Sequence, residues 1–170
     1  MRISVTIAAL ATVASLAVAG SAGARGPGPA STAARRCPVS AARAPFRHDA
    51  AARRRLVPGQ PKGLILCRYA GLNVSDPLGL SSSREVHGPQ RVRRLGHRFN
   101  LLKPFPRGRA VCPADFGRQI LARFRYPRAT DDYVAVDLSG CRSVTNGPRT
   151  RASLGRHGSR LVRTLRRLTG

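Results

Sequence analysis

The clearest hydrophobic pattern in the chain predicts a helix over Pro89–Leu102. Its large apolar residues recur at intervals of three, four and three positions, which places them on one helical face: Val92, Leu95, Phe99 and Leu102. Pro89 suits the first helical turn, where its missing N–H leaves no bond unmade. A second helix is predicted over Ser159–Leu168, with Ser159 as N-cap and Gly170 as stop. Its apolar face consists of Leu161, Val162, Leu165 and Leu168.

Shorter apolar runs predict four strands. The run Leu64–Tyr69 predicts one strand, with which the weaker alternation of Leu78–Val86 can pair. Gln119–Tyr126 alternates strictly, a polar turn over Pro127–Asp132 follows, and Tyr133–Leu138 returns as a strand. These last two strands predict a hairpin.

The resulting order, β-β-α-β-β-α, favours an α+β fold: a two-layer antiparallel sheet with helices on one face. Apolar residues are concentrated between Leu64 and Val144, so we expect the α+β domain over residues 63–147. Residues 25–62, rich in Ala, Pro and Arg, predict a mostly irregular basic arm. Residues 148–170 predict a basic C-terminal helical segment.

The first 24 residues have the composition of a secretory signal peptide. Arg2 supplies a positive n-region, Ile3–Ala19 is apolar and uncharged, and Ala22–Ala24 offers small residues for cleavage. An uncleaved anchor is the alternative, but an Ala-rich stretch of this length is at the short limit for a membrane span. We therefore expect a secreted protein, extracellular or associated with the cell wall, with no transmembrane segment after cleavage.

The four cysteines, Cys37, Cys67, Cys112 and Cys141, predict two disulfides, because an even number in a short exported chain is typical of a disulfide framework. Three pairings are possible. The predicted hairpin carries Cys112 and Cys141 towards the same end and favours their pairing, which leaves Cys37 with Cys67. A zinc site is disfavoured because no C-x-x-C or Cys/His cluster occurs, and we expect no metal or other cofactor.

Four segments carry a resemblance to known proteins: Leu64–Tyr69, Phe99–Leu102, Cys112–Gly117 and Gly140–Gly147. Together they resemble a group of small secreted proteins of high-GC Gram-positive bacteria, a resemblance that implies no activity. The chain is more distantly similar to the actinobacterial subtilisin-inhibitor family, in which a Cys-Pro segment follows the helix and precedes a hairpin and a partner Cys.

The subtilisin-inhibitor resemblance implies a protease-binding loop over Cys112, Pro113, Ala114 and Asp115. Ala114 would occupy the primary specificity position and Asp115 the position after the scissile bond of a secreted serine protease. The alternative is that Cys-Pro only begins a strand and that the disulfide staples a small sheet. The predicted helix has no Cys, whereas the family's second disulfide joins its strand to its helix.

The charge of the chain points to a different partner. The 31 basic residues against seven acidic ones give a net charge of +24. Such an excess attracts anionic polymers such as teichoic acid and extracellular nucleic acid. The candidate residues lie in three basic stretches: Arg53, Arg54, Arg55, Arg91, Arg94, Arg98, Arg160, Arg163, Arg166 and Arg167. Solvated charge without a specific partner is the simpler alternative.

One catalytic arrangement is also present. Glu85 and His87, two residues apart with Arg91 or Arg94 nearby, have the groups of a small secreted ribonuclease: base, acid and phosphate-binding cation. The aromatic residues that would stack nucleobases are few. The sequence therefore favours a non-enzymatic basic binding protein, with a protease inhibitor as the alternative and a ribonuclease as a remote one.

Overall fold

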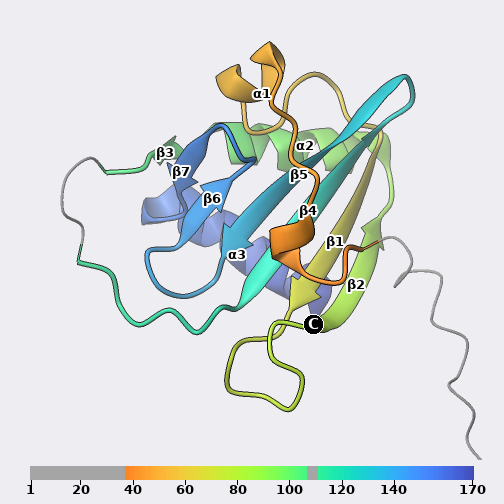
Figure 1. The fold of residues 1–170 in the computed structure, drawn as a ribbon. Coiled ribbons are helices and arrows are strands. Elements are labelled where there is room, and N and C mark those ends of the chain that lie inside the picture. Colours follow the sequence, from red (N-terminus) through yellow and green to blue (C-terminus); the bar gives the residue numbers. More distant parts are fainter. Residues whose placement is uncertain (1–36, 107–110) are drawn as a thin grey trace, which may run out of the picture.

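The central feature of the structure, a computed structural model that describes residues 37–106 and 111–170, is one seven-stranded antiparallel sheet (Figure 1). Its strands are arranged in the order β2-β1-β4-β5-β6-β7-β3. Their bounds are Gly63–Tyr69 (β1), Leu80–Val86 (β2), Lys103–Pro104 (β3), Gln119–Tyr126 (β4), Ala129–Asp137 (β5), Ser143–Thr145 (β6) and Thr150–Ala152 (β7). The predicted hairpin is β4 and β5, with Ile120 opposite Val136.

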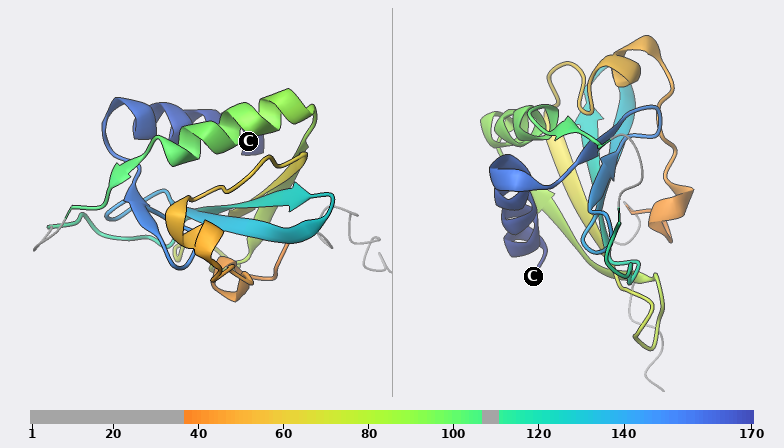
Figure 2. Two further views of the ribbon diagram at one scale, coloured as in Figure 1. Left: turned by 90° about the horizontal axis from the view of Figure 1, so that it is seen from above. Right: turned by 90° about the vertical axis from the view of Figure 1, so that its left-hand side faces the viewer.

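Two long helices, α2 (Pro89–Asn100) and α3 (Gly155–Thr169), cover one face of this sheet (Figure 2). The predicted apolar faces of both helices point into the resulting core, where Val92, Phe99, Leu161 and Leu165 are fully buried. Phe99 packs edge-on against Phe124 of β4, with ring centroids 5.5 Å apart. The predicted mixed helix and sheet fold with an antiparallel sheet is thus confirmed, and the two predicted helices lie on one face of the sheet. The predicted two-layer arrangement is incomplete, because the other face is also covered.

The opposite face of the sheet is covered by the chain that the sequence predicted as an irregular arm. This segment contains a 3-10 turn, η2 (Ala41–Arg43), and a short helix, α1 (Ala50–Arg54), which Asp49 caps through the N–H groups of Ala51 and Ala52. Ala41 and Ala44 pack against Ile65, Cys67, Tyr69, Leu121, Tyr133 and Ala135 in a second, smaller core. The sheet is therefore buried on both faces.

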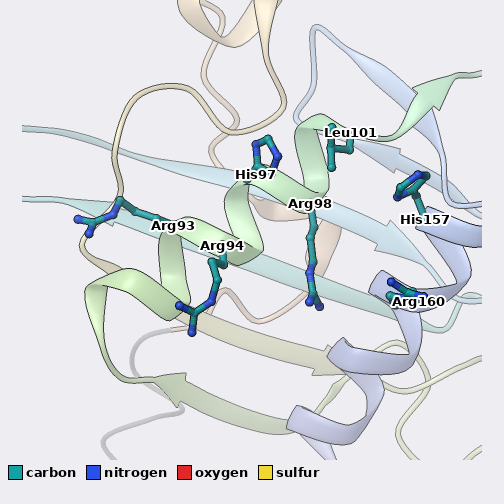
Figure 3. A pocket seen from close by; sticks show the side chains of 7 residues that line it. All are labelled: Arg93, Arg94, His97, Arg98, Leu101, His157 and Arg160. Atoms are coloured by element: carbon teal, nitrogen blue, oxygen red, sulfur yellow. The ribbon is translucent and has the colours of Figure 1, made fainter.

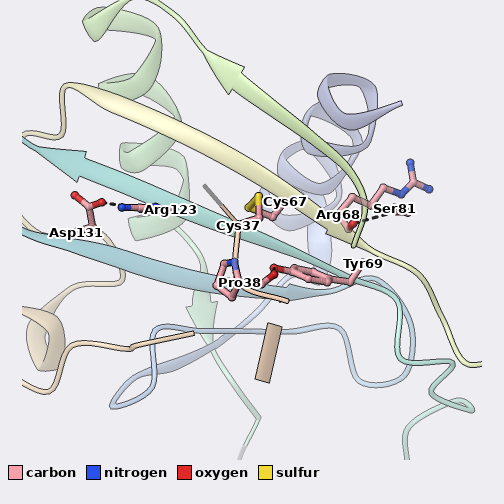
Figure 4. Close-up of a disulfide and its surroundings, with 8 residues drawn as sticks. All are labelled: Cys37, Pro38, Cys67, Arg68, Tyr69, Ser81, Arg123 and Asp131. Carbon is pink, nitrogen blue, oxygen red and sulfur yellow. Dashed lines mark hydrogen bonds and ion pairs between the residues drawn. A yellow bond between two sulfur atoms is a disulfide. The ribbon is translucent and has the colours of Figure 1, made fainter. Parts of the chain in front are cut away.

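A disulfide and several hydrogen bonds hold this arm in place. The Cys37–Cys67 disulfide joins it to β1, and the Tyr69 hydroxyl donates to the Pro38 carbonyl at 2.7 Å (Figure 4). Buried Asn146 donates to three arm carbonyls, at 3.0 to 3.3 Å: those of Ala52, Arg55 and Leu56. The second disulfide is Cys112–Cys141, so both favoured pairings are confirmed.

The predicted element order was incomplete. It omitted the short strands β3, β6 and β7, of which β7 follows the tight turn after Thr145. It also began the last helix at Ser159, whereas α3 begins at Gly155 after the N-cap position Leu154. Gly158 lets the first turn of this helix approach the preceding chain, since a Cβ there would lie 2.2 Å from the carbonyl carbon of Ser153. The predicted signal peptide, Met1–Ala24, lies outside the described residues, as does the first part of the arm.

Candidate functional site

The outer surface of α2 and α3 carries the densest positive charge of the described chain. The two helices together contain nine arginines and two histidines, and neither contains Asp or Glu. Because their apolar residues face the sheet, most of these cations face solvent. The amphipathic pattern that builds the core therefore also builds a basic face.

This face is hollowed where the two helices meet (Figure 3). A groove of about 480 Å³ is lined by Arg93, Arg94, His97, Arg98 and Leu101 on the α2 side and by His157 and Arg160 of α3. Figure 3 shows Arg98 extending from α2 towards α3, beside Arg160. The close approach of the two helices thus brings cations from both to one concave surface.

Two further hollows adjoin this groove. One of about 730 Å³ shares Arg98 and Arg160 with it and continues along α3 past Arg156, Arg163 and Arg167. The other, of about 460 Å³, shares Arg93 and His97 with it and reaches the chain after α1 at Arg55, Val57, Gly59, Gln60 and Pro61. We call the surface formed by these three hollows the basic helix face.

The cations of the basic helix face are not neutralised by acidic partners within residues 37–106 and 111–170. The ion pairs between described residues join Arg47 to Asp49, Arg123 to Asp131 and Arg125 to Glu85, and none of these residues belongs to α2 or α3. An unpaired guanidinium keeps its hydrogen-bond donors available for an external anion.

The structure gathers some of the predicted basic residues and separates others. Arg94, Arg98, Arg160, Arg163 and Arg167 line the groove or its extension along α3, and Arg55 lines the hollow that adjoins Arg93. Arg53 and Arg54 belong to α1, which lies on the other side of the sheet (Figure 2). Arg91 lines a different hollow, beside Arg167.

Arg166 is exposed, as predicted for the outer side of α3, but it lines neither the groove nor its extension along the helix. Its guanidinium Nη2 instead donates to the Leu138 carbonyl at 3.1 Å, and desolvation together with the nearby Arg142, Arg118 and Arg68 lowers its pKa. Arg156 takes its place in the row, one turn before Arg160. Arg156 and His157 were missed because the predicted helix began after them, whereas Arg93 and His97 lie within the predicted helix but were not among the candidate residues.

The segment that resembles an inhibitory loop lies outside the sheet. Residues 111–118 have no regular secondary structure, and Val111–Phe116 are all exposed. The alternative that Cys112-Pro113 begins a strand is therefore wrong, since β4 starts at Gln119.

This exposed segment is tied to the chain after β5 at two points. Cys112 is bonded to Cys141, and the Asp115 carboxylate accepts from Ser139 Oγ at 2.7 Å and from the Gly117 N–H at 2.9 Å. The hydrogen bond from Ser139, followed by that from Gly117, lowers the pKa of Asp115. Ala114 lies between the two ties.

Some of the residues that suggested a ribonuclease lie together in the structure. Glu85, His87 and Arg91 line one hollow of about 370 Å³ with Arg84 and Arg167, whereas Arg94 lines the groove between the helices. Arg125 Nη1 lies 3.5 Å from a Glu85 carboxylate oxygen, so this carboxylate already interacts with a cation. A general base needs a carboxylate directed at its substrate, and this arrangement does not favour one.

Within the described ranges, no group of three or more His, Cys, Asp or Glu side chains is placed to hold a metal ion. The same residues include no helix with the length and apolar character needed to cross a bilayer. In comparisons with known proteins, no family model, curated protein or solved structure matches this chain.

Proposed function

We propose that this protein is a secreted, non-catalytic binding protein that attaches to anionic polymers through the basic helix face. The observation that supports it is the concentration of unpaired cations on one concave surface built by α2 and α3. Both helices lack acidic residues, so an approaching polyanion meets attraction along their whole length.

The geometry favours an extended ligand over a small one. The three hollows adjoin one another, and along α3 the residues Arg156, Arg160, Arg163 and Arg167 recur every three or four positions on one side. At about 1.5 Å of rise per residue, this row spans roughly 16 Å. A chain of phosphates laid along the row would meet a guanidinium at every turn of the helix.

The chemistry of the face favours contact with phosphates over contact with bases. Single-stranded nucleic acids are commonly held by aromatic side chains that stack on the bases. No aromatic residue other than histidine lines the three hollows, and Phe99, the aromatic residue of α2, is buried. We therefore propose phosphate-backbone polymers, such as teichoic acid or extracellular nucleic acid, bound without sequence preference.

The salt dependence of binding tests this proposal. Each phosphate neutralised on a duplex adds about 0.9 to the slope of log affinity against log salt. We expect the substitution of Arg156, Arg160, Arg163 and Arg167 by Gln to reduce that slope by up to about 3.6 on duplex DNA. Retention on immobilised teichoic acid should fall in parallel, while circular dichroism stays unchanged because these side chains lie outside the core.

A matched control removes the same number of charges elsewhere. In this variant Arg43, Arg53, Arg54 and Arg128, which are exposed and lie outside α2 and α3, are replaced by Gln. We expect its slope to change by less than half as much. Equal losses in the two variants would mean that net charge alone drives adhesion and would refute a defined binding face.

A second candidate function is protease inhibition, favoured by the exposed Cys112–Asp115 segment. An inhibitory loop binds tightly when it is already fixed in its bound shape, because little entropy is then lost on binding. The Cys112–Cys141 disulfide and the hydrogen bond from Ser139 to Asp115 provide such fixation on both sides of Ala114.

Kinetic assays with a subtilisin-like protease test this second function. The protein should slow the protease at micromolar concentration, Ala114→Leu should strengthen inhibition by filling the specificity pocket, and Ala114→Pro should abolish it. Ala129→Leu, at the exposed start of β5, serves as the control that adds the same bulk elsewhere. Absence of inhibition by both the wild type and Ala114→Leu would exclude an inhibitory role.

A further inference from the structure

Four arginines from distant parts of the chain converge away from the basic helix face, at one end of the sheet. Arg68 is in β1, Arg118 directly precedes β4, Arg142 directly precedes β6, and Arg166 is in the last turns of α3. Their clustering is not visible in the sequence, where consecutive members are 24 to 50 positions apart.

The strand register places the Arg68 side chain beneath α3. Arg68 is opposite Ile120, whose side chain lies in the core under the helices. Directly paired residues of antiparallel strands present their side chains to the same face of the sheet. Figure 4 shows the Arg68 side chain leaving β1 on the side away from Tyr69, which packs under the arm.

Hydrogen bonds bring Arg166 to the same place. The Leu138 N–H donates to the Arg118 carbonyl at 2.9 Å, and the Leu138 carbonyl accepts from Arg166 Nη2 at 3.1 Å. A single residue thus links the backbone of Arg118 with the guanidinium of Arg166.

Arg142 is the least expected member of the cluster. Its φ of 54° is in the left-handed region that residues other than glycine rarely adopt, and its carbonyl accepts from Ser153 N at 2.9 Å and Ser153 Oγ at 2.7 Å. Its Nε is buried without a hydrogen-bond partner among the described residues. A buried charged donor left unpaired is costly, so an arrangement that only served stability would not be expected to keep it.

Arg166 is surrounded by like charge. The charges that lower its pKa are those of Arg142, Arg118 and Arg68. Arg68 and Arg142 are partly buried and Arg118 and Arg166 are exposed, and an anion between these four cations relieves their mutual repulsion. Guanidinium groups match tetrahedral oxyanions, since their fixed forks of N–H donors pair with two oxygens at once.

We propose that Arg68, Arg118, Arg142 and Arg166 form a binding site for one phosphate- or sulfate-type oxyanion. The site is independent of the basic helix face, because Arg166 turns towards Leu138 while Arg163 and Arg167 line the outer hollow. The oxyanion bridges β1, β4, α3 and the turn before β6, and it supplies the acceptor that the Arg142 Nε lacks.

Calorimetric titration with inorganic phosphate and with sulfate, at constant ionic strength set by chloride, tests the site. We expect saturable binding of one anion per chain and a thermal midpoint that rises with anion concentration. Arg118→Gln, at an exposed position, should weaken binding at least tenfold without loss of fold, and Arg118→Lys should fall between the two. Arg142→Gln should also weaken binding, and it removes the Nε donor itself.

Arg163→Gln is the matched control, since it removes one charge from the basic helix face and should leave phosphate affinity unchanged. Equal weakening by Arg163→Gln and Arg118→Gln, or binding that does not saturate, would overturn the proposal. A phosphodiester polymer with no terminal phosphate distinguishes the two sources of the ligand: its binding should depend on Arg163 and not on Arg118. The oxyanion site and the polymer-binding face can therefore fail separately.

Discussion

We predict that the free energy of unfolding falls between pH 4 and pH 8, and that replacement of the buried Asp132 by Asn removes most of this fall. Asp132 is fully buried in β5, and neither carboxylate oxygen accepts a hydrogen bond of good geometry from a described residue. Desolvation raises its pKa to about 7, and Asp49 adds to the effect. Arg47 and the Tyr133 N–H act in the opposite direction but offset only part of it.

The size of the effect follows from that pKa. A rise from the ordinary value of 3.8 to about 7 is roughly three units, or about 4 kcal/mol of differential interaction. The unfolded chain releases this proton near pH 4, whereas the folded chain retains it up to about pH 7. Stability associated with the protonated carboxyl is therefore fully present below pH 4 and is lost as the pH rises through 7.

Chemical denaturation followed by far-ultraviolet circular dichroism, at pH intervals from 4 to 8 with the disulfides intact, measures this dependence. We expect the free energy of unfolding of the wild type to fall by up to about 4 kcal/mol more than that of Asp132→Asn over this range. Asp49 and Asp115 do not interfere, because their pKa values are lowered and their contributions are lost only below pH 4. Asp132→Val provides a second variant without an amide. Parallel curves for wild type and both variants would refute the reasoning.

Three further changes test the packing of the fold. Asn146→Ala should lower the free energy of unfolding by about 3 kcal/mol, because three buried arm carbonyls lose their donor; a loss below 1 kcal/mol in denaturant titration would contradict this role. Gly158→Ala should lower the thermal midpoint despite the better helix propensity of Ala, since the added Cβ meets the backbone of Ser153; an unchanged or higher midpoint would show that α3 can shift. Joint replacement of Cys37 and Cys67 by Ser opens a loop of sequence separation 30, and calorimetry should record a loss of about 3.6 kcal/mol. A loss near zero would mean that the arm packs without its disulfide.

The elements that the sequence predicted are those whose pattern is local. The apolar face of α2 repeats over about three turns, and the alternation in β4 with the return of β5 defines a hairpin. Short strands such as β3 and β7 have no such pattern. β3 has two residues and β7 has three. They are strands because the fold pairs Lys103 with Ala152 and Pro104 with Arg151. Sequence periodicity cannot detect a strand that long-range pairing defines.

The candidate sites show the same limit. The helix periodicity indicated a basic outer surface, but the helix start placed at Ser159 left out Arg156, and the periodicity could not show that Arg166 bonds to the Leu138 carbonyl. The cover of the second sheet face was also missed, because the arm contributes small residues such as Ala41 and Ala44 that lack a periodic pattern. The oxyanion cluster depends on tertiary contacts throughout.

The separation of acidic residues from the basic helix face gives the molecule a preferred orientation at a charged surface. All seven acids lie outside α2 and α3: Asp49, Asp76, Glu85, Asp115, Asp131, Asp132 and Asp137. This separation of charge gives the molecule an electric dipole, which turns the two helices towards an anionic layer before contact is made. The exposed segment of residues 111–118, which leads into β4, runs along the lower left edge of the sheet in Figure 1 and includes no part of α2 or α3, so adsorption through these helices leaves that segment outside the contact. Adhesion through the helices and recognition of a protein by this segment are therefore compatible in a single adsorbed molecule.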